Sequence, residues 1–288
     1  MTGVQTCALP IPRNAPVNAI RIGFLSPNRT NLGAQRANFF EVVGDAARRG
    51  ALLAESDAGQ HGAIPVIIHL ASTPSADSAE RAARRLATLD GVDALIGGLG
   101  DGQAHRIQRV AYEAGIPFLN IGDSSPAIRS SCSELSFHIE PSATAYLQAL
   151  IKTHLHYGTN NIARFFAVVE NGKEGQDLLA GVEALAMDIS GTELAGSATV
   201  FPGQPDYSTV FAAAKAKDVD FILLLIGPRD QIPFLAQQQN YLPDVPVAPY
   251  PHAVTQTRDF LAAARFQTGS TERRVAAWDP SLQGTDEE

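Results

Sequence analysis

Two loops rich in glycine, serine and aspartate have the residue types best suited to binding a small ligand. One covers residues 97–102, Gly-Gly-Leu-Gly-Asp-Gly, and the other covers residues 122–125, Gly-Asp-Ser-Ser. The backbone N–H groups and hydroxyls of such loops suit a small anion such as a carboxylate, above all where a helix begins. Neither loop contains a nucleophile paired with a general base. The loops therefore indicate a binding protein rather than an enzyme.

The segments around these loops predict two parallel strands joined by one helix. An apolar strand at residues 93–96 leads into the first loop, and another at residues 116–121 leads into the second. Between them, apolar residues recur at a helical period, at Ala104, Ile107, Val110, Ala111 and Ala114. Parallel strands place their carboxyl ends at one edge of a sheet, where open α/β sheets bind ligands. We therefore expect the two loops to lie side by side, with a short helix beginning at Pro126.

Strand and helix alternate in this way through most of the chain. Strands are expected at residues 20–25 and 65–70, a helix at about residues 33–49, and an irregular, exposed stretch at residues 50–62. After residues 140–142, Glu-Pro-Ser, the alternation restarts. A repeat of roughly 25 to 30 residues implies parallel sheets with right-handed connections. We predict an α/β protein of two Rossmann-like lobes, each a parallel sheet flanked by helices, with the cleft between the lobes as the ligand site.

The same pattern suggests a domain division. Residues 1–18 are expected to be a non-native scar and linker, residues 19–141 the first lobe, residues 142–250 the second lobe, and residues 251–288 a hinge with an incomplete return to the first lobe. Residues 1–11 resemble a translated sequencing adapter, with a degenerate signal peptide or a disordered tail as the alternatives. No helix is expected to follow the last strand-like segment. The pattern therefore predicts a fragment whose C-terminal part is truncated.

Composition and charge argue against several classes of function. The 288 residues carry a net charge of −8 and no basic cluster, which disfavours nucleic-acid binding. Cys7 and Cys132 form no metal-binding pattern and no disulfide framework. No apolar run reaches the roughly 18 residues that a membrane-spanning helix needs, and the chain has no nucleophile elbow, zinc-protease motif or P-loop. We therefore expect no enzymatic activity, no metal and no cofactor.

The spacing of Gly98 and Gly100 also suits a dinucleotide-binding loop, and Asp123 lies near the expected place of a ribose-binding acid. Position 103, however, is Gln rather than the third glycine that allows tight packing of helix on strand. A nicotinamide-dependent dehydrogenase is therefore the weakest of the alternatives.

Four stretches of the sequence together resemble the type 1 periplasmic substrate-binding proteins, in particular the leucine/isoleucine/valine-binding branch that serves ABC transporters. The stretches are residues 92–98, 113–118, 137–142 and 203–208. The resemblance implies the type 1 periplasmic binding protein fold and a monomeric protein working in the periplasm or elsewhere outside the cytoplasm. It also implies an amino acid or amide-like small-molecule ligand and an ABC transporter permease as membrane partner.

In that family, two loops of the first lobe hold the carboxylate and ammonium of the ligand, and loops of the second lobe close over its side chain. Carried over to this sequence, the candidate ligand-binding residues are Gly100, Asp101, Gly102, Gly122, Asp123, Ser124, Glu174, Gly227 and His252. The implied mechanism is hinge closure, with hinges near Glu140-Pro141 and after Tyr250.

This sequence departs from the family pattern at several of these positions. Asp101 stands where a serine or threonine is usual, Glu174 stands where an aromatic residue is frequent, and no acidic residue near Tyr250 matches the usual partner of the ammonium. A carboxylate ligand about 4 Å from such an aspartate would be repelled by roughly 4 kcal/mol at an effective dielectric constant of 20. Either the ligand is not a simple apolar amino acid, or the aspartates are structural. Asp101 also suits a helix cap, Asp123 a capping turn, and Glu174 a solvated first helical turn.

A regulatory or sensor protein of the same fold is the main alternative. Residues 220–225 and 244–248 fit the lipoprotein activators of peptidoglycan synthases about as well as the transporter proteins. Such a protein acts through a protein partner and needs no small ligand.

Overall fold

The computed structural model describes residues 18–27, 39–61, 64–100, 102–130, 133–159, 161–252 and 255, with side chains at all of these except residues 39–42 and 61. Its contacts divide the chain into two compact units. The first unit holds the first strand together with residues 44–120 and 133–137. The second holds residues 39–43 and 121–130 and everything described from His138 onward.

The first unit is built on a five-stranded sheet in the order β2-β1-β3-β4-β5. Its strands are β1 (Ile20–Ser26), β2 (Val66–Ser72), β3 (Ala94–Gly97), β4 (Phe118–Asn120) and β5 (Ser136–His138), and its helices are α1 (Phe39–His61), α2 (Ala76–Thr88) and α3 (Gln103–Ala114). The pairs β1–β2, β1–β3 and β3–β4 are parallel. The strand, helix and strand expected around the first loop are confirmed as β3, α3 and β4.

The core of the first unit lies between this sheet and helices α2 and α3. Its fully buried side chains include Leu25, Leu95 and Phe118 from the strands and Leu86 and Ile107 from the helices. Gly23 permits this close packing, because a Cβ atom there would lie 2.7 Å from the Leu95 side chain.

Helix α1 corrects one sequence prediction. It continues to His61, so the expectation of an irregular stretch at residues 50–62 is wrong. Residues 51–55, Ala-Leu-Leu-Ala-Glu, are strong helix formers, and one glycine in an exposed helix costs only about 1 kcal/mol. Glu55 adds a tertiary contact, because its Oε1 accepts a hydrogen bond from the backbone N–H of Ile68 in β2 at 2.9 Å.

The second unit is built on a four-stranded parallel sheet in the order β7-β6-β8-β9. Its strands are β6 (Ala163–Glu170), β7 (Thr192–Val200), β8 (Phe221–Leu225) and β9 (Val247–Pro249). Its helical segments are α4 (Pro126–Ser130), α5 (Ala143–His154), the 3-10 turn η1 (Leu155–Tyr157), α6 (Lys173–Asp188), α7 (Ser208–Ala216) and α8 (Pro228–Tyr241). The short helix expected at Pro126 is confirmed as α4.

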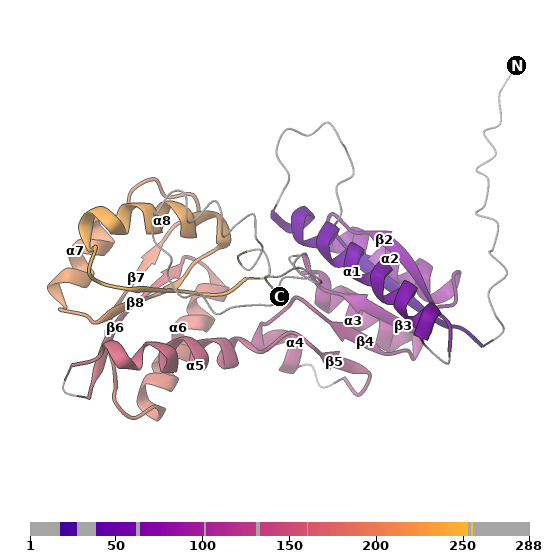
Figure 1. The fold of residues 1–288 in the computed structure, drawn as a ribbon, viewed down its shortest axis with the longest axis horizontal. Helices are drawn as coiled ribbons and strands as arrows, with labels where there is room; N and C mark the ends of the chain where they lie inside the picture. The colour runs from indigo at the N-terminus through magenta and orange to yellow at the C-terminus, as the bar shows by residue number, and fades with distance from the viewer. Residues whose placement is uncertain are drawn as a thin grey trace, which may run out of the picture. The chain divides into compact units, whose positions relative to one another are not determined.

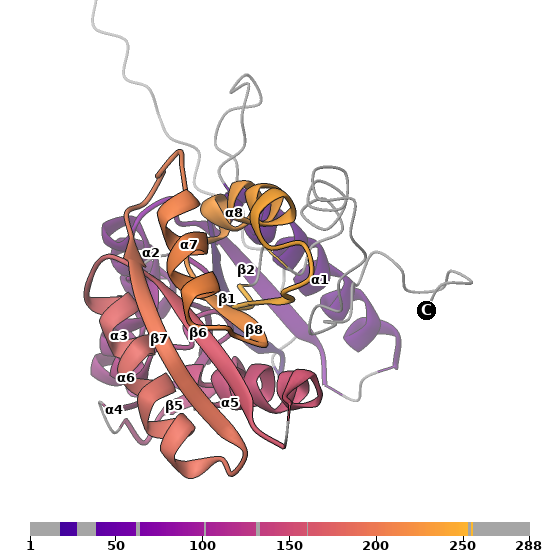
Figure 2. The ribbon, with the colours of Figure 1, turned by 90° about the vertical axis from the view of Figure 1, so that its left-hand side faces the viewer.

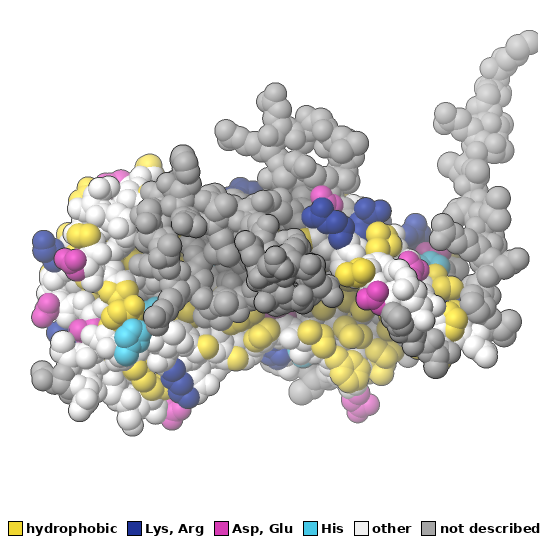
Figure 3. Space-filling model, in the orientation of Figure 1, with side chains coloured by type: hydrophobic (Ala, Val, Ile, Leu, Met, Phe, Trp, Pro, Cys, Tyr) yellow, Lys and Arg dark blue, Asp and Glu magenta, His cyan; other side chains and the backbone are white. Residues whose placement is uncertain are grey.

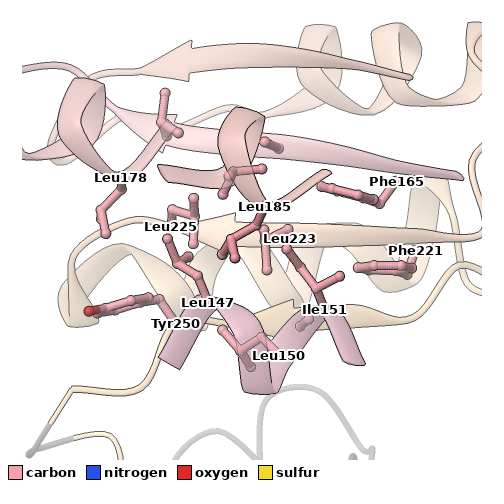
Figure 4. Close-up of a cluster of buried hydrophobic side chains, with 14 of the residues drawn as sticks. Leu147, Leu150, Ile151, Phe165, Leu178, Leu185, Phe221, Leu223, Leu225 and Tyr250 are labelled. Carbon is pink, nitrogen blue, oxygen red and sulfur yellow. The ribbon is translucent and has the colours of Figure 1, made fainter. Parts of the chain in front are cut away.

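Helices cover both faces of this sheet, with α5 and α6 on one side and α7 and α8 on the other (Figures 1 and 2). Successive strand residues point to opposite faces, so Phe165 and Leu223 join one buried cluster while Phe166 and Ile222 join the other. Figure 4 shows Leu147, Leu150 and Ile151 of α5 packed against strands β6 and β8 in the first of these clusters. Burial on both faces explains why these strands read as continuous apolar runs.

The predicted fold class is confirmed: the chain is an α/β protein with two parallel sheets flanked by helices. On the described part of the face in Figure 3, charged side chains of both signs are distributed over the surface. None of the described helices is both long and apolar enough to cross a membrane.

Candidate functional site

In each sheet the order of the strands reverses at one point. The reversal lies between β1 and β3 in the first unit and between β6 and β8 in the second. Ligands of open α/β sheets bind at the carboxyl ends of the strands beside such a reversal. The loops that follow β3, β6 and β8 are therefore the natural places to look for binding groups, together with the neighbouring loops after β4 and β9.

The first loop starts beside the end of β4, because Gly97 at the end of β3 is paired with Asn120. Gly98 has a φ angle of +99°, and a Cβ atom there would lie 2.8 Å from Oδ1 of Asn120, so only glycine fits. Gly102 has a φ angle of +64° and occupies the N-cap position of α3. Asp101 lies outside the described residues, so its predicted contact with the ligand stays a prediction.

The side chain of Gln103 fills the space behind the first loop. It is 1% exposed, its Nε2 donates to the backbone oxygen of Thr73 at 2.6 Å, and its Oε1 accepts from the hydroxyl of Thr73 at 3.1 Å. A Cβ atom on Gly100 would lie 2.5 Å from Gln103 Nε2. A carboxamide therefore lies where a dinucleotide-binding loop needs a glycine, which argues further against the dehydrogenase alternative.

The second loop is held by hydrogen bonds within the second unit. The backbone N–H of Ser125 donates to Oδ1 of Asp123 at 2.8 Å, which is the capping turn that the sequence offered as one role for this aspartate. The backbone oxygen of Ser124 accepts from the N–H of Ala143 at 2.8 Å. The hydroxyl of Ser124 lies 3.0 Å from the hydroxyl of Tyr250, just after β9. Tyr250 is therefore a candidate site residue that the sequence pointed to only as the residue before an expected hinge.

Aromatic and acidic side chains surround the hydroxyl of Tyr250. The Tyr250 ring is 3% exposed and meets the rings of Tyr146 and His252 edge to face, with centroids 5.8 and 5.3 Å away. The hydroxyl of Tyr146 donates to Oε1 of Glu140 at 2.8 Å. Burial raises the pKa of Tyr250 to about 12, and the charges of Glu174, Glu140 and Asp123 act in the same direction, against the hydrogen bond with Ser124.

Three carboxyl groups are thus near enough to this phenol to disfavour its ionisation. Glu174 lies in the first turn of α6 and is exposed, which agrees with the structural alternative for this residue. Burial is the largest cause of the raised pKa of Glu140, and the charge of Asp123 adds to it. The charge of Arg129 acts on Glu140 in the opposite direction, so charges of both signs lie near this part of the second unit.

The loops after β6, β8 and β9 are linked to one another. Glu170, at the end of β6, accepts from the N–H of Gly227 at 2.8 Å, and a Cβ atom on Gly227 would lie 2.9 Å from the Glu170 carboxylate. Nε2 of His252 donates to the backbone oxygen of Ile226 at 3.0 Å, and burial lowers the pKa of this imidazole. The contacts of Gly227 and His252 described here hold these loops together, and their predicted contacts with a ligand stay predictions.

The candidate residues thus fall into two groups. Gly122, Asp123, Ser124, Glu174, Gly227 and His252 belong to the second unit, and Gly100 and Gly102 belong to the first. Among the residues that the structure describes, no group of three or more His, Cys, Asp or Glu side chains could hold a metal ion. Cys132 lies outside the described residues.

Solved structures with the same fold come from several bacteria. A branched-chain amino acid ABC transporter periplasmic ligand-binding protein from Burkholderia xenovorans aligns with a TM-score of 0.69 and 17% identity over 88% of this chain and 73% of that chain. A putative branched-chain amino acid ABC transporter from Silicibacter pomeroyi aligns with a TM-score of 0.68 and 19% identity over 86% of this chain and 64% of that chain. An ABC transporter solute-binding protein from R. palustris in complex with benzoate aligns with a TM-score of 0.63 and 18% identity over 85% of this chain and 65% of that chain.

This chain spans only 60% or 61% of the length of three other solved relatives, from Burkholderia mallei, R. palustris and Pseudomonas fluorescens. A comparison with curated protein sequences found no match. The family model described as periplasmic binding protein, in contrast, matches residues 19–249, which include every strand of both sheets. The chain therefore belongs to the periplasmic binding protein family.

Proposed function

We propose that this protein is the extracytoplasmic solute-binding component of an ABC transporter and that its ligand is an amino acid. The observation that carries the proposal is the approach of the Ser124 and Tyr250 hydroxyls, 3.0 Å apart, from the loops after β4 and β9. A hydroxyl at a loop followed by a helix suits a carboxylate. Membership of the periplasmic binding protein family supports a role in binding rather than catalysis.

Charge supports an amino acid over a simple carboxylic acid. The solved relatives include proteins named for branched-chain amino acids and one in complex with benzoate, and these ligands share a carboxylate. Near Tyr250, however, the charges of Glu174, Glu140 and Asp123 disfavour a further negative charge on the phenol. A carboxylate about 4 Å from one of them is repelled by roughly 4 kcal/mol at an effective dielectric constant of 20. A ligand that also carries an ammonium group offsets this repulsion.

Hinge closure between two lobes is part of the proposal, as are a monomeric state and delivery of the solute to a membrane permease. The ligand must bind the closed form more tightly than the open form, because otherwise closure would not follow binding.

A thermal-shift screen of the full chain tests the proposal. The compounds are the twenty L-amino acids, benzoate and 4-hydroxybenzoate. A ligand at 100 times its Kd adds about 2.7 kcal/mol to the free energy of unfolding, which raises the Tm of a protein of this size by about 4–5 °C. We expect such a shift from one class of amino acid and from neither aromatic acid. A cooperative melt that no compound moves would overturn the proposal and favour the partner-binding regulator instead.

A further inference from the structure

We propose that Tyr250 is a positioning residue that holds the Ser124 hydroxyl in place for the ligand's carboxylate. The inference rests on the proposed function, because Ser124 has a ligand to meet only if the protein binds a solute. It goes beyond that function by assigning a role to a side chain at the end of β9, 126 positions from Ser124 in sequence.

Tyr250 is itself fixed by contacts at its backbone and its ring. Its N–H donates to the backbone oxygen of Leu224 in β8 at 2.8 Å, and its backbone oxygen accepts from Nε2 of Gln231 at 2.8 Å. Gln231 is fully buried in the first turn of α8. The ring is enclosed by those of Tyr146 and His252, and Figure 4 shows it at the margin of the buried cluster with its oxygen pointing away from the cluster. The hydroxyl of Tyr250 is therefore presented at a defined place.

Ser124 is attached to the same unit on two sides. Its backbone oxygen accepts from the N–H of Ala143 in the first turn of α5, and its hydroxyl meets Tyr250. Arg129 of α4 donates to the backbone oxygen of Glu140, so helix α4 is also attached to the segment that precedes α5. The contacts of residues 121–130 accordingly group them with the second unit, although β4 belongs to the first. Of these contacts, the one from the Tyr250 side chain is made to the Ser124 hydroxyl, which is the group proposed to bind the ligand.

Counting protons shows what the hydroxyl pair offers a ligand. The two hydroxyls carry one proton each and share one hydrogen bond, and within the described part of the chain neither hydroxyl has a second hydrogen-bond partner. One O–H donor therefore remains for an acceptor on a ligand. A phenol with the ordinary pKa of 10.0 is protonated at neutral pH, and burial raises the pKa of Tyr250 further. A phenol is also the more acidic of the two groups. When Tyr250 donates to Ser124, the proton of Ser124 is directed to the ligand and the donor is strengthened by the hydrogen bond it accepts.

The test compares Tyr250→Phe with the matched control Tyr146→Phe. Both variants remove one hydrogen-bonded phenol hydroxyl and keep the ring, but only Tyr250 contacts Ser124. Amide hydrogen exchange of the ligand-free protein, resolved by residue, reports on the loop directly. We expect the exchange of Ala143, whose N–H is bonded to Ser124, to become several-fold faster in Tyr250→Phe and to stay unchanged in Tyr146→Phe. Equal exchange in wild type and Tyr250→Phe overturns the positioning role, whether or not a ligand is known.

Calorimetric titration with the amino acid that most stabilises the wild type supplies the second readout. A lost hydrogen bond of about 0.5–1.5 kcal/mol corresponds to a roughly 2- to 10-fold rise in Kd. We expect this rise for Tyr250→Phe and for Ser124→Ala, and no further rise in the double variant, because both changes remove the same donor. If the increases in Kd of the two single variants instead multiply in the double variant, the proposed coupling of Tyr250 to Ser124 is overturned. A wild type that binds none of the amino acids contradicts the proposed function, and in that case the exchange measurement alone decides the role of Tyr250.

Discussion

At the scale of single residues, Glu140 is the side chain whose chemistry depends most on its neighbours. Its carboxyl group accepts from the hydroxyl of Tyr146, and Arg129 donates to its backbone oxygen. Burial raises the pKa of this carboxyl above its ordinary value of 4.5, while the hydrogen bond from Tyr146 and the charge of Arg129 lower it in part. The folded protein therefore binds a proton at Glu140 more tightly than the unfolded chain does.

This shift predicts a pH dependence of stability. A group with a raised folded pKa stabilises the fold at low pH, and that contribution is lost as the pH rises from the unfolded value to the folded one. In Glu140→Gln the side chain no longer titrates but still accepts from Tyr146. We expect its Tm to depend less on pH above about 4.5 than that of the wild type, and to equal or exceed the wild-type Tm at pH 8. A steeper loss of Tm in Glu140→Gln above this pH, measured by circular dichroism, would contradict this.

At the scale of elements, close backbone approach decides where glycine is required. Gly175 lies in the first turns of α6, and a Cβ atom there would lie 1.8 Å from the backbone oxygen of Glu170 at the end of β6. Gly50 lies in the middle of α1 and has nothing within 4 Å of the place of its Cβ atom. Packing therefore requires glycine at position 175, whereas position 50 has room for a side chain.

Alanine at these two positions should have opposite effects on stability. Gly175→Ala forces α6 away from β6 and should lower the free energy of unfolding by more than about 3 kcal/mol, as overpacking does where backbone must shift. Gly50→Ala should raise it by about 0.5–1 kcal/mol, because alanine is the better helix former. Urea unfolding at equal protein concentration measures both. Similar stabilities of the two variants would contradict the packing of α6 on β6.

At the scale of the whole molecule, each described unit has a buried interior of its own. In the second unit, Leu147 of α5 is 1% exposed within the cluster of Figure 4, whereas Met187 at the end of α6 is 85% exposed. These interiors hold in place the strands that carry the candidate loops.

Removing core volume should therefore weaken the second unit strongly. Leu147→Ala is expected to lower the free energy of unfolding by about 2–5 kcal/mol, through lost burial and the cavity left behind. Met187→Ala, which removes a similar volume from the surface, is expected to change it by less than about 0.5 kcal/mol. Urea unfolding followed by far-ultraviolet circular dichroism compares the two variants. A loss below 1 kcal/mol for Leu147→Ala would mean that α5 does not pack on the sheet as described.

Local patterns in the sequence were enough to predict the two parallel sheets, the short helix at Pro126 and the membership of the binding-protein family. The sheets and the helix depend on the periodicity of apolar residues and on glycines at the ends of strands, which act over a few neighbouring positions. The family was inferred from the resemblance of residues 92–98, 113–118, 137–142 and 203–208. The same local view ended α1 too early, because a single glycine looks like a stop signal when the surrounding helix formers and the contact of Glu55 with β2 are not weighed against it.

The tertiary structure alone decided which of the candidate residues meet. Tyr250 and Ser124 are 126 positions apart, and nothing in either local segment indicates that their hydroxyls lie within hydrogen-bonding distance. The attachment of residues 121–130 to the second unit has the same origin, because it depends on contacts with Ala143, Glu140 and Tyr250 rather than on the strand that precedes the loop. Periodicity determined the elements and the edge where we expect a ligand, whereas the neighbours of each side chain at that edge follow from how distant segments pack.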